Sequence, residues 1–279
     1  MAKAPHQKTP SLADLRREID RIDETMHALL IERGQIIDEL IAVKKSQETG
    51  SAFRPAREAD MMRRLVQRHH GSLPLDTVES IWRVIISTFT YVQAPFSVHA
   101  DLSAGDALMR DSARFHFGFT VPFEPHLGAA GVVQAVTASR GDLGLVPAFA
   151  VAGAGPWWTA LEFETAPKII ARLPFVERAD HPAGLPVFVI SRVPADAMVT
   201  ETEVWSVRVS GWSASAVDKL AGIADAIAVP DRAFDGGALL ISVARDGIGR
   251  VAEALLATGA SIRSRTLVGS HATRYTVPR

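Results

Sequence analysis

A single long amphipathic helix over residues 12–47 constrains the fold of this chain more than any other feature. Its apolar side chains recur at intervals of three and four residues, which places them along one side of an α-helix. They are Leu12, Leu15, Ile19, Ile22, Met26, Leu29, Ile36 and Leu40. A helix of this length spans on the order of 50 Å, more than the diameter of a small domain. The two shorter helices that follow cannot cover the whole stripe, so we expect a second copy of the chain to bury the rest in a dimer.

Three cations on this helix point to an anionic ligand. Arg33 and Lys44 stand where Leu or Ile would continue the stripe, and a separation of about three turns makes them face the same way. Arg16 lies about 4.7 turns before Arg33 and therefore faces a different neighbour. Buried cations need anions, and no acid stands at a matching helical offset. The alternative is that Arg33 and Lys44 reach water while their apolar stems cover the core.

Composition sets the broad class of the protein. The chain has 279 residues, enough for two or three small domains, and its formal net charge of −1 argues against a general nucleic-acid binder. It contains no cysteine, which excludes disulfides and thiolate chemistry. Residues 1–10 are polar and are predicted to be a disordered tail rather than a signal peptide. No apolar run approaches the roughly 20 residues that span a bilayer, so we expect a cytoplasmic protein that does not bind membranes.

The first hundred residues are predicted to form a three-helix unit over residues 11–95. Ser11 is a candidate N-cap of the long helix, with Asp14 as its capping-box partner. A second helix is expected over 56–70. A third is expected from Pro74 to about Gln93, where Pro95 ends it.

The polar residues of this unit form a recognisable pattern. It reads Leu15-Arg16-x-x-Ile19-Asp20-x-Ile22-Asp23, Leu29-Leu30-x-x-Arg33, Lys44, Pro55-x-Arg57-Glu58 and Ile85-Ile86-Ser87 followed by Gln93. In this order and spacing it resembles the all-helical, type II chorismate mutases. The resemblance implies an intertwined homodimer that rearranges chorismate to prephenate without a cofactor or a metal ion.

The resemblance also implies which residues are catalytic. Lys44 would donate a hydrogen bond to the ether oxygen and a carboxylate of chorismate, and Gln93 would donate to the same oxygen. Arg33 would bind a substrate carboxylate. Such donors suit a rearrangement in which negative charge grows on the ether oxygen while the substrate is held in its compact conformer. Arginine suits the carboxylates because its guanidinium group makes two-point contacts.

Three further residues are implied in substrate binding. Arg16 would reach across the dimer interface to the second substrate carboxylate. Glu58 would orient the ring hydroxyl, supported by the neighbouring Arg57. Two positions depart from the family pattern, namely Arg54 before the Arg-Glu pair and Phe89 where a small hydroxyl residue is usual.

Residues 97–200 change to an α/β pattern. Strands are predicted over 119–123, 143–146 and 187–191, and helices over 104–117 and 129–139. The segments 112–118, 132–136 and 141–147 resemble the front half of prephenate dehydratases, enzymes to which helical chorismate mutases are often fused. The dehydratase site motifs are missing. Pro186-Val187-Phe188 stands at the catalytic Thr-Arg-Phe, so we expect that dehydration is lost.

Residues 203–275 are predicted to fold in the order β-α-β-β-α-β. The expected strands cover 204–210, 225–229, 238–244 and 261–267, and the expected helices cover 213–222 and 249–258. This order resembles an ACT-type regulatory domain, and the ending Leu267-Val268-Gly269-Ser270-His271 is similar to that family's final Leu-Gly-Ser-Tyr. The motifs that bind an amino acid in that family are absent.

The predicted fold is therefore α plus α/β, and the predicted function is that of a chorismate mutase. Three alternatives stay open. An isochorismate pyruvate lyase uses the same helical fold and similar cations, and a bifunctional mutase and dehydratase would need an active α/β half. A non-catalytic regulatory protein would bind aromatic-pathway metabolites without turnover, and Arg54 and Phe89 would then mark the loss of activity.

Overall fold

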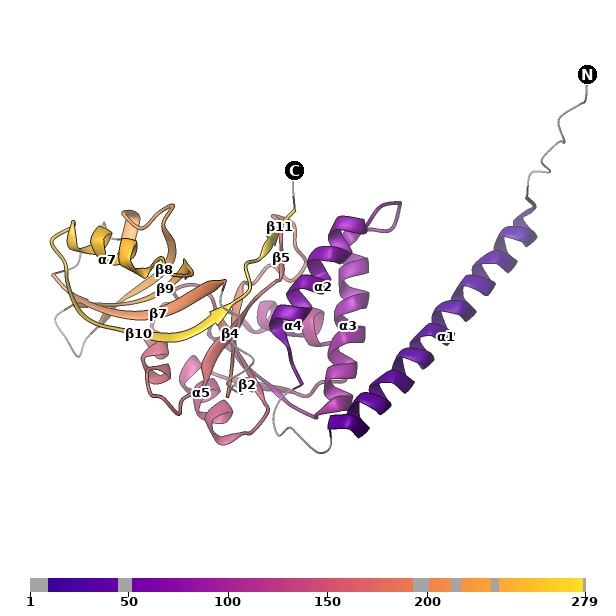
Figure 1. The fold of residues 1–279 in the computed structure, drawn as a ribbon, viewed down its shortest axis with the longest axis horizontal. Helices are drawn as coiled ribbons and strands as arrows, with labels where there is room; N and C mark the ends of the chain where they lie inside the picture. Colours follow the sequence, from indigo (N-terminus) through magenta and orange to yellow (C-terminus); the bar gives the residue numbers. More distant parts are fainter. Residues whose placement is uncertain (1–9, 45–51, 193–200, 212–216, 232–235, 278–279) are drawn as a thin grey trace, which may run out of the picture. The chain divides into compact units, whose positions relative to one another are not determined.

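The computed structural model describes residues 10–44, 52–192, 201–211, 217–231 and 236–277 (Figure 1). The chain divides into two compact units, Met1–Glu48 and Thr49–Arg279. The second unit contains helices as well as a large mixed sheet, so the prediction of a helical region followed by an α/β region is confirmed at this level. The predicted domain boundaries at 95, 97, 200 and 203 stay predictions.

The first unit consists of one long helix, α1, which spans Leu12–Lys44. The predicted cap is present, since the Asp14 carboxylate accepts from the Ser11 backbone amide at 2.9 Å and Ser11 Oγ accepts from the Asp14 amide at 3.2 Å. The expected last turn, 45–47, lies outside the described residues. Most of the apolar stripe is exposed, with Leu12 at 65% and Leu29 at 58%. No helix among the described residues is long and apolar enough to span a membrane.

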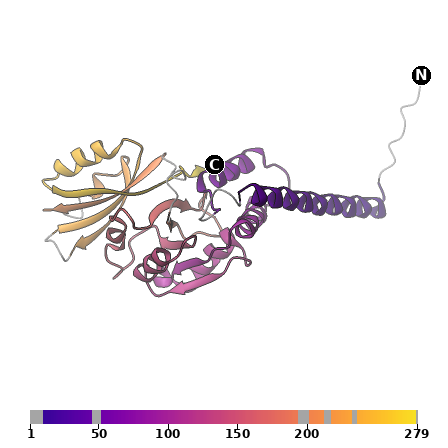
Figure 2. The ribbon, with the colours of Figure 1, turned by 60° about the horizontal axis from the view of Figure 1, so that its bottom comes forward.

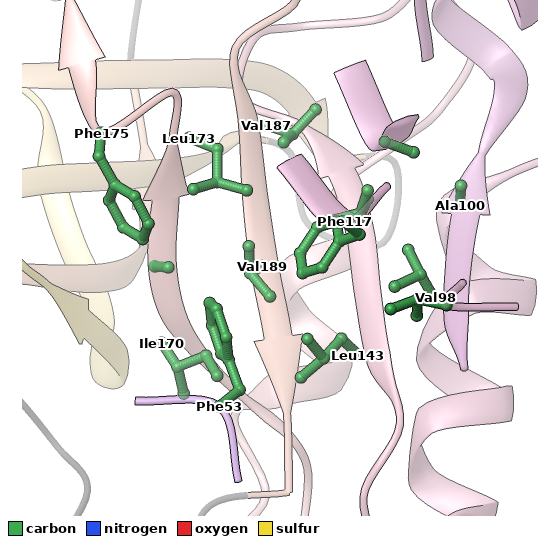
Figure 3. Packing of buried hydrophobic residues seen from close by; sticks show 14 of the residues in the cluster. Phe53, Val98, Ala100, Phe117, Leu143, Ile170, Leu173, Phe175, Val187 and Val189 are labelled. Carbon is green, nitrogen blue, oxygen red and sulfur yellow. The ribbon is translucent and has the colours of Figure 1, made fainter. Parts of the chain in front are cut away.

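The second unit begins with two helices that run side by side (Figure 1), α2 over Pro55–Arg68 and α3 over Leu75–Gln93. Both match the predicted ranges within two residues. Proline accounts for their starts, because Pro55 occupies the first turn of α2 and Pro74 is the N-cap of α3. Helix α2 contacts β4 and β5, and α3 packs against α4. Phe53 and Phe117 lie in one buried cluster with Leu143, Ile170 and Val189 of the sheet (Figure 3).

A nine-stranded sheet forms the centre of the second unit, in the order β2-β1-β3-β6-β4-β10-β7-β9-β8. Its first five strands are β1 Val98–Asp101, β2 Phe123–His126, β3 Leu143–Pro147, β4 Lys168–Leu173 and β6 Val187–Ser191. Helices α4 (Asp106–Phe117) and α5 (Ala129–Ala138) connect the parallel strands β1, β2 and β3. Two 3-10 helices, Leu102–Ala104 and Trp157–Leu161, lie in the connections, and a two-stranded sheet pairs β5 (Val176–Glu177) with β11 (Tyr275–Thr276).

The strand predicted over 119–123 is wrong, because β2 shares only Phe123 with it. Helix α4 ends at Phe117, and the next residue, Gly118, has a φ of +67° that turns the chain away. The Arg114 guanidinium group then donates to the carbonyl oxygens of Gly118 and Val121, at 3.0 and 3.2 Å. These bonds hold the segment in a turn, and Phe119 is left 84% exposed.

The C-terminal strands form an antiparallel group in the order β10-β7-β9-β8, as expected for a β-α-β-β-α-β sequence. The strands are β7 Thr202–Ser210, β8 Ala224–Asp231, β9 Gly236–Ala244 and β10 Ser261–His271. The second predicted helix is α7, Ile248–Leu256, which lies along one face of these strands (Figure 2). The start of the other predicted helix, residues 213–216, lies outside the described residues.

Strand β9 is buried on both faces, because alternate residues face opposite sides. Leu239, Ile241 and Val243 pack in the cluster with α7. Leu240 points the other way and packs with Phe188 of β6 and Ile227 of β8. The C-terminal group is thus packed directly against the preceding α/β region.

The two halves of the sheet meet where β10 pairs with β4, at Gly269 and Ile169. A Cβ atom at Gly269 would lie 2.1 Å from the Ile169 carbonyl oxygen and 2.6 Å from its nitrogen. Backbone atoms of a central strand cannot move aside as the end of a flexible side chain can. Glycine is therefore required for the strands to approach this closely.

Gly269→Ala is expected to lower the free energy of unfolding by about 1–3 kcal/mol, the usual cost of overpacking a well-packed site. Urea unfolding followed by circular dichroism measures this loss. Gly249→Ala in α7 is the matched control, since a Cβ atom there meets nothing within 4 Å. Equal stability of the two variants would contradict the close approach at Gly269.

Candidate active site

The cations of the first unit lie along α1. Arg16 is exposed and Arg33 is half-buried. Lys44 is the last helical residue of α1. These three residues belong to one unit, while the other predicted site residues belong to the second. Their common site stays a prediction.

Glu58 on α2 lies in a buried ion pair. It is 4% exposed, and its carboxylate accepts from Nη1 of Arg83 on α3 at 2.7 Å. Arg83 is fully buried and also donates through Nε and Nη2 to the His116 carbonyl oxygen, at 3.3 and 3.1 Å. Burial raises the pKa of Glu58, and the charge of Arg83 opposes that rise. In this geometry Arg83 occupies one oxygen of the carboxylate predicted to orient the substrate hydroxyl.

A second buried charge cluster binds α3 to the loop after β5. Glu79 is fully buried and accepts from Arg178 Nη1 at 2.8 Å, and it lies 3.1 Å from His181 Nε2. Arg178 also reaches Asp76, one turn earlier on α3, at 3.1 Å. Neither cluster was predicted from the sequence. The available signal was the pair Glu79 and Arg83, four residues apart beside the apolar face of α3.

The remaining predicted residues lie at the ends of the same helices. Arg57 is exposed in the first turn of α2, next to Glu58. Gln93 ends α3 and is half-buried, and its side-chain amide donates to the Phe89 carbonyl oxygen at 3.0 Å. Its hydrogen-bond donor is thus turned back onto its own helix in this conformation.

The positions of the dehydratase motifs contain apolar side chains. Val187 and Phe188 are buried in β6, and Pro186 contributes only its carbonyl oxygen, which accepts from the Ala148 amide at 2.8 Å. The nearby Trp158 is 1% exposed and belongs to the core. The cavity beside it measures about 10 Å³, space for roughly one water molecule. Among the described residues, no group of three or more imidazole or acidic side chains could hold a metal ion.

His271, at the end of β10, makes the stability of the fold depend on pH. Its side chain is almost fully buried, and burial lowers its pKa to about 4, with Arg172 and Arg274 acting in the same direction. An unfolded chain protonates this histidine at its ordinary pKa of about 6.5, well before the folded protein does. The stability that neutral His271 contributes is therefore present above about pH 6.5 and is lost as the pH falls toward 4.

This pKa shift predicts a larger loss of stability on acidification in the unmodified protein than in His271→Gln. Between pH 7 and pH 5, the free energy of unfolding should fall by about 2 kcal/mol more in the unmodified protein. Urea unfolding of both proteins at the two pH values measures the difference. The same substitution at the exposed His70 is the control and should leave the pH dependence unchanged. A parallel loss in all three proteins would contradict the role of His271.

Comparison with known proteins agrees with the helical pattern. Residues 15–94 match the family model described as chorismate mutase type II. The chain is 29% identical over 140 residues to the bifunctional chorismate mutase/prephenate dehydratase of Stutzerimonas stutzeri. The aligned region covers 49% of this chain and 38% of that protein. The protein of the same description from Pseudomonas aeruginosa is 30% identical over 141 residues, with the same shares. The chain thus spans well under half the length of these relatives.

Two solved structures overlap weakly with this chain. One is GqqA, described as a novel type of quorum quenching acylase, with a TM-score of 0.41, 14% identity and coverage of 64% of this chain and 95% of that one. The other is prephenate dehydratase from Streptococcus mutans, with a TM-score of 0.38, 13% identity and coverage of 65% and 99%. Over residues 15–94 the chain is similar to the chorismate mutase type II family.

Proposed function

We propose that residues 11–95 act as a chorismate mutase, which rearranges chorismate to prephenate in the biosynthesis of phenylalanine and tyrosine, without a cofactor. The match of residues 15–94 to the type II family carries this proposal, because the matched range contains all six predicted site residues. Lys44 and Gln93 would stabilise charge on the ether oxygen, and Arg33 would hold a carboxylate. Arg57 and Glu58 would complete the binding site.

The active form is proposed to be an intertwined homodimer. The support is the apolar stripe of α1, where Ile19 is 57% exposed and Met26 is 54% exposed. Apolar surface of this extent along one helix is typical of a helix that packs against a partner. In such a dimer Arg16 would serve the site of the other subunit.

Subunit mixing tests this arrangement. Arg16→Ala and Lys44→Ala each remove one residue from every site, so each homodimer should have little activity. In a mixed dimer one site lacks both residues and the other retains both. Random mixing should therefore restore about a quarter of the unmodified activity if Arg16 acts across the interface. Mixtures no more active than the separate variants would place both residues in the same subunit's site.

The rest of the chain is proposed to be a non-dehydrating appendage. Residues 97–200 would be a degenerate dehydratase-like region, because Pro186 lacks the hydroxyl group that the Thr-Arg-Phe motif supplies. Residues 203–275 would be an ACT-like domain, as the strand order β10-β7-β9-β8 supports. We place the protein in the cytoplasm on the basis of this biosynthetic role.

Product analysis after incubation with chorismate tests the activity. Prephenate as the main product is the expected result. Phenylpyruvate would mean that the α/β region is an active dehydratase. Pyruvate formed from isochorismate, with no prephenate from chorismate, would favour the lyase.

The ion pair of Glu58 favours a second candidate, a non-catalytic protein that binds metabolites of this pathway. Arg83 holds the Glu58 carboxylate at 2.7 Å, and the Gln93 amide is bonded to a backbone carbonyl, so both groups are engaged within the chain. This candidate predicts that chorismate binds without turnover. Titration calorimetry alongside the product assay distinguishes the two functions.

A further inference from the structure

A cavity of about 610 Å³ lies between the C-terminal strands and the preceding α/β region. Its apolar wall includes Phe149, Phe188 of β6, Ile227 of β8 and Leu240 of β9. This volume is within the usual range of small-molecule sites, which are mostly apolar with a few polar groups that fix orientation. The cavity is separate from the six residues of the proposed mutase site, because none of them lines it.

Two arginines from different parts of the chain line this cavity. Arg172 lies on β4, and Arg274 lies between β10 and β11. Their side chains are only 13% and 15% exposed. The guanidinium group of Arg172 also lies 5.8 Å from the centre of the Phe188 ring. Two cations therefore adjoin an apolar wall.

The partners of these arginines lie toward solvent. Arg172 pairs with Asp225, whose side chain is 69% exposed, and Arg274 pairs with Glu177 at 2.8 Å, whose side chain is 45% exposed. A third acid, Asp218, also lines the cavity. Nε of Arg172 is buried and has no hydrogen-bond partner among the described residues. Burial and the charge of Arg172 lower the pKa of Arg274.

The acidic partners of both arginines are solvated, so water competes for their side of each pair and weakens it. A carboxylate that entered the cavity could replace Asp225 on Arg172 and form a charge-assisted pair away from water. Its apolar body would then cover Phe188 and Leu240. An inorganic anion would form the ion pair with Arg172 but would leave the apolar wall of the cavity exposed to water.

We propose that this cavity binds a small organic acid, with its carboxylate between Arg172 and Arg274 and its apolar ring system against Phe149 and Phe188. The site is distinct from the mutase site, and neither proposal depends on the other. The ligand class follows from the two cations, the aromatic wall and the volume together.

Titration calorimetry of the full chain with naphthoate tests the proposal, because this probe combines a carboxylate with two fused rings. Naphthylmethanol keeps the rings without the charge, and inorganic phosphate keeps a charge without the rings. Naphthoate is expected to bind at least about tenfold more tightly than either, since a charged hydrogen bond and the burial of rings each contribute that much. Equal binding of phosphate, or no binding of naphthoate, would overturn the proposal.

Substitutions in the cavity and outside it show where naphthoate binds. Arg172→Gln and Arg274→Gln should each weaken naphthoate binding about tenfold or more. Arg250→Gln, on the exposed side of α7, is the matched control and should bind as the unmodified protein does. Arg33→Ala should also leave binding unchanged, which excludes the mutase site. Arg274 lies outside the large sheet, so its variant remains informative if Arg172→Gln fails to fold. Binding that is lost in Arg33→Ala but kept in both cavity variants would overturn the assignment.

Discussion

Lys44→Ala is expected to lower the turnover of chorismate by about a hundredfold or more, the usual cost of removing a donor that is preorganised toward a growing negative charge. The ether oxygen gains charge only as its bond to carbon breaks. The loss should therefore fall mainly on kcat, and binding of the ground state should change less.

A steady-state assay that follows the disappearance of chorismate measures this effect. Arg17→Ala is the matched control on the same helix, since Arg17 is exposed and pairs with Asp14 in the first turn. Near-normal kcat in the Lys44 variant would remove Lys44 from the proposed mechanism. An equal loss in the Arg17 variant would indicate damage to α1 rather than to the chemistry.

Arg83→Met should be the most destabilising of these substitutions, with a loss of about 3–5 kcal/mol in the free energy of unfolding. The substitution leaves the Glu58 carboxylate buried without Arg83 and removes both donors to the His116 carbonyl oxygen. Breaking one side of a buried pair costs far more than the pair itself contributes, because the remaining charge must be kept out of water or take up a proton.

Urea unfolding measures the loss, and two further variants interpret it. Arg63→Met breaks an exposed pair with Asp60 on α2 and should change stability by about 1 kcal/mol or less. Adding Glu58→Gln to Arg83→Met should recover much of the loss, since no uncompensated charge is then buried. If Arg83→Met matched the Arg63 control, the Glu58 pair would have no structural importance.

The ranges of the helices and of β6 could be predicted because local signals define them. Proline begins α2 and α3, and β6 is a continuous apolar run over Val187–Ser191. Strand β1 was missed because half of its four residues are polar. His99 on that strand is held in place by His126 at 2.9 Å and Asp142 at 3.3 Å, contacts that no local pattern reveals.

The candidate site was predictable in its residue types more than in its environment. The order of cations, acid and amide along the helices predicted the similarity to type II chorismate mutases that the family match over residues 15–94 also finds. It did not indicate that Glu58 would pair with Arg83, or that Glu79 would meet Arg178 and His181 about a hundred residues later. Such partners depend on which elements pack together in the folded chain. Hydrophobic periodicity predicts which face of a helix is buried, but not which residues contact that face.

The pairing of β4 with β10 determines which strands lie at the edges of the sheet, where a strand of another chain could be added. Once the two groups of strands are fused, β2 and β8 are its outer strands. Each contains a proline, Pro125 in β2 and Pro230 in β8, which has no amide hydrogen to offer to another chain. Both edge strands therefore pair less readily with a strand of another chain, the contact through which exposed sheet edges cause aggregation. Growth of this sheet by adding a strand from another chain is therefore disfavoured at both of its edges.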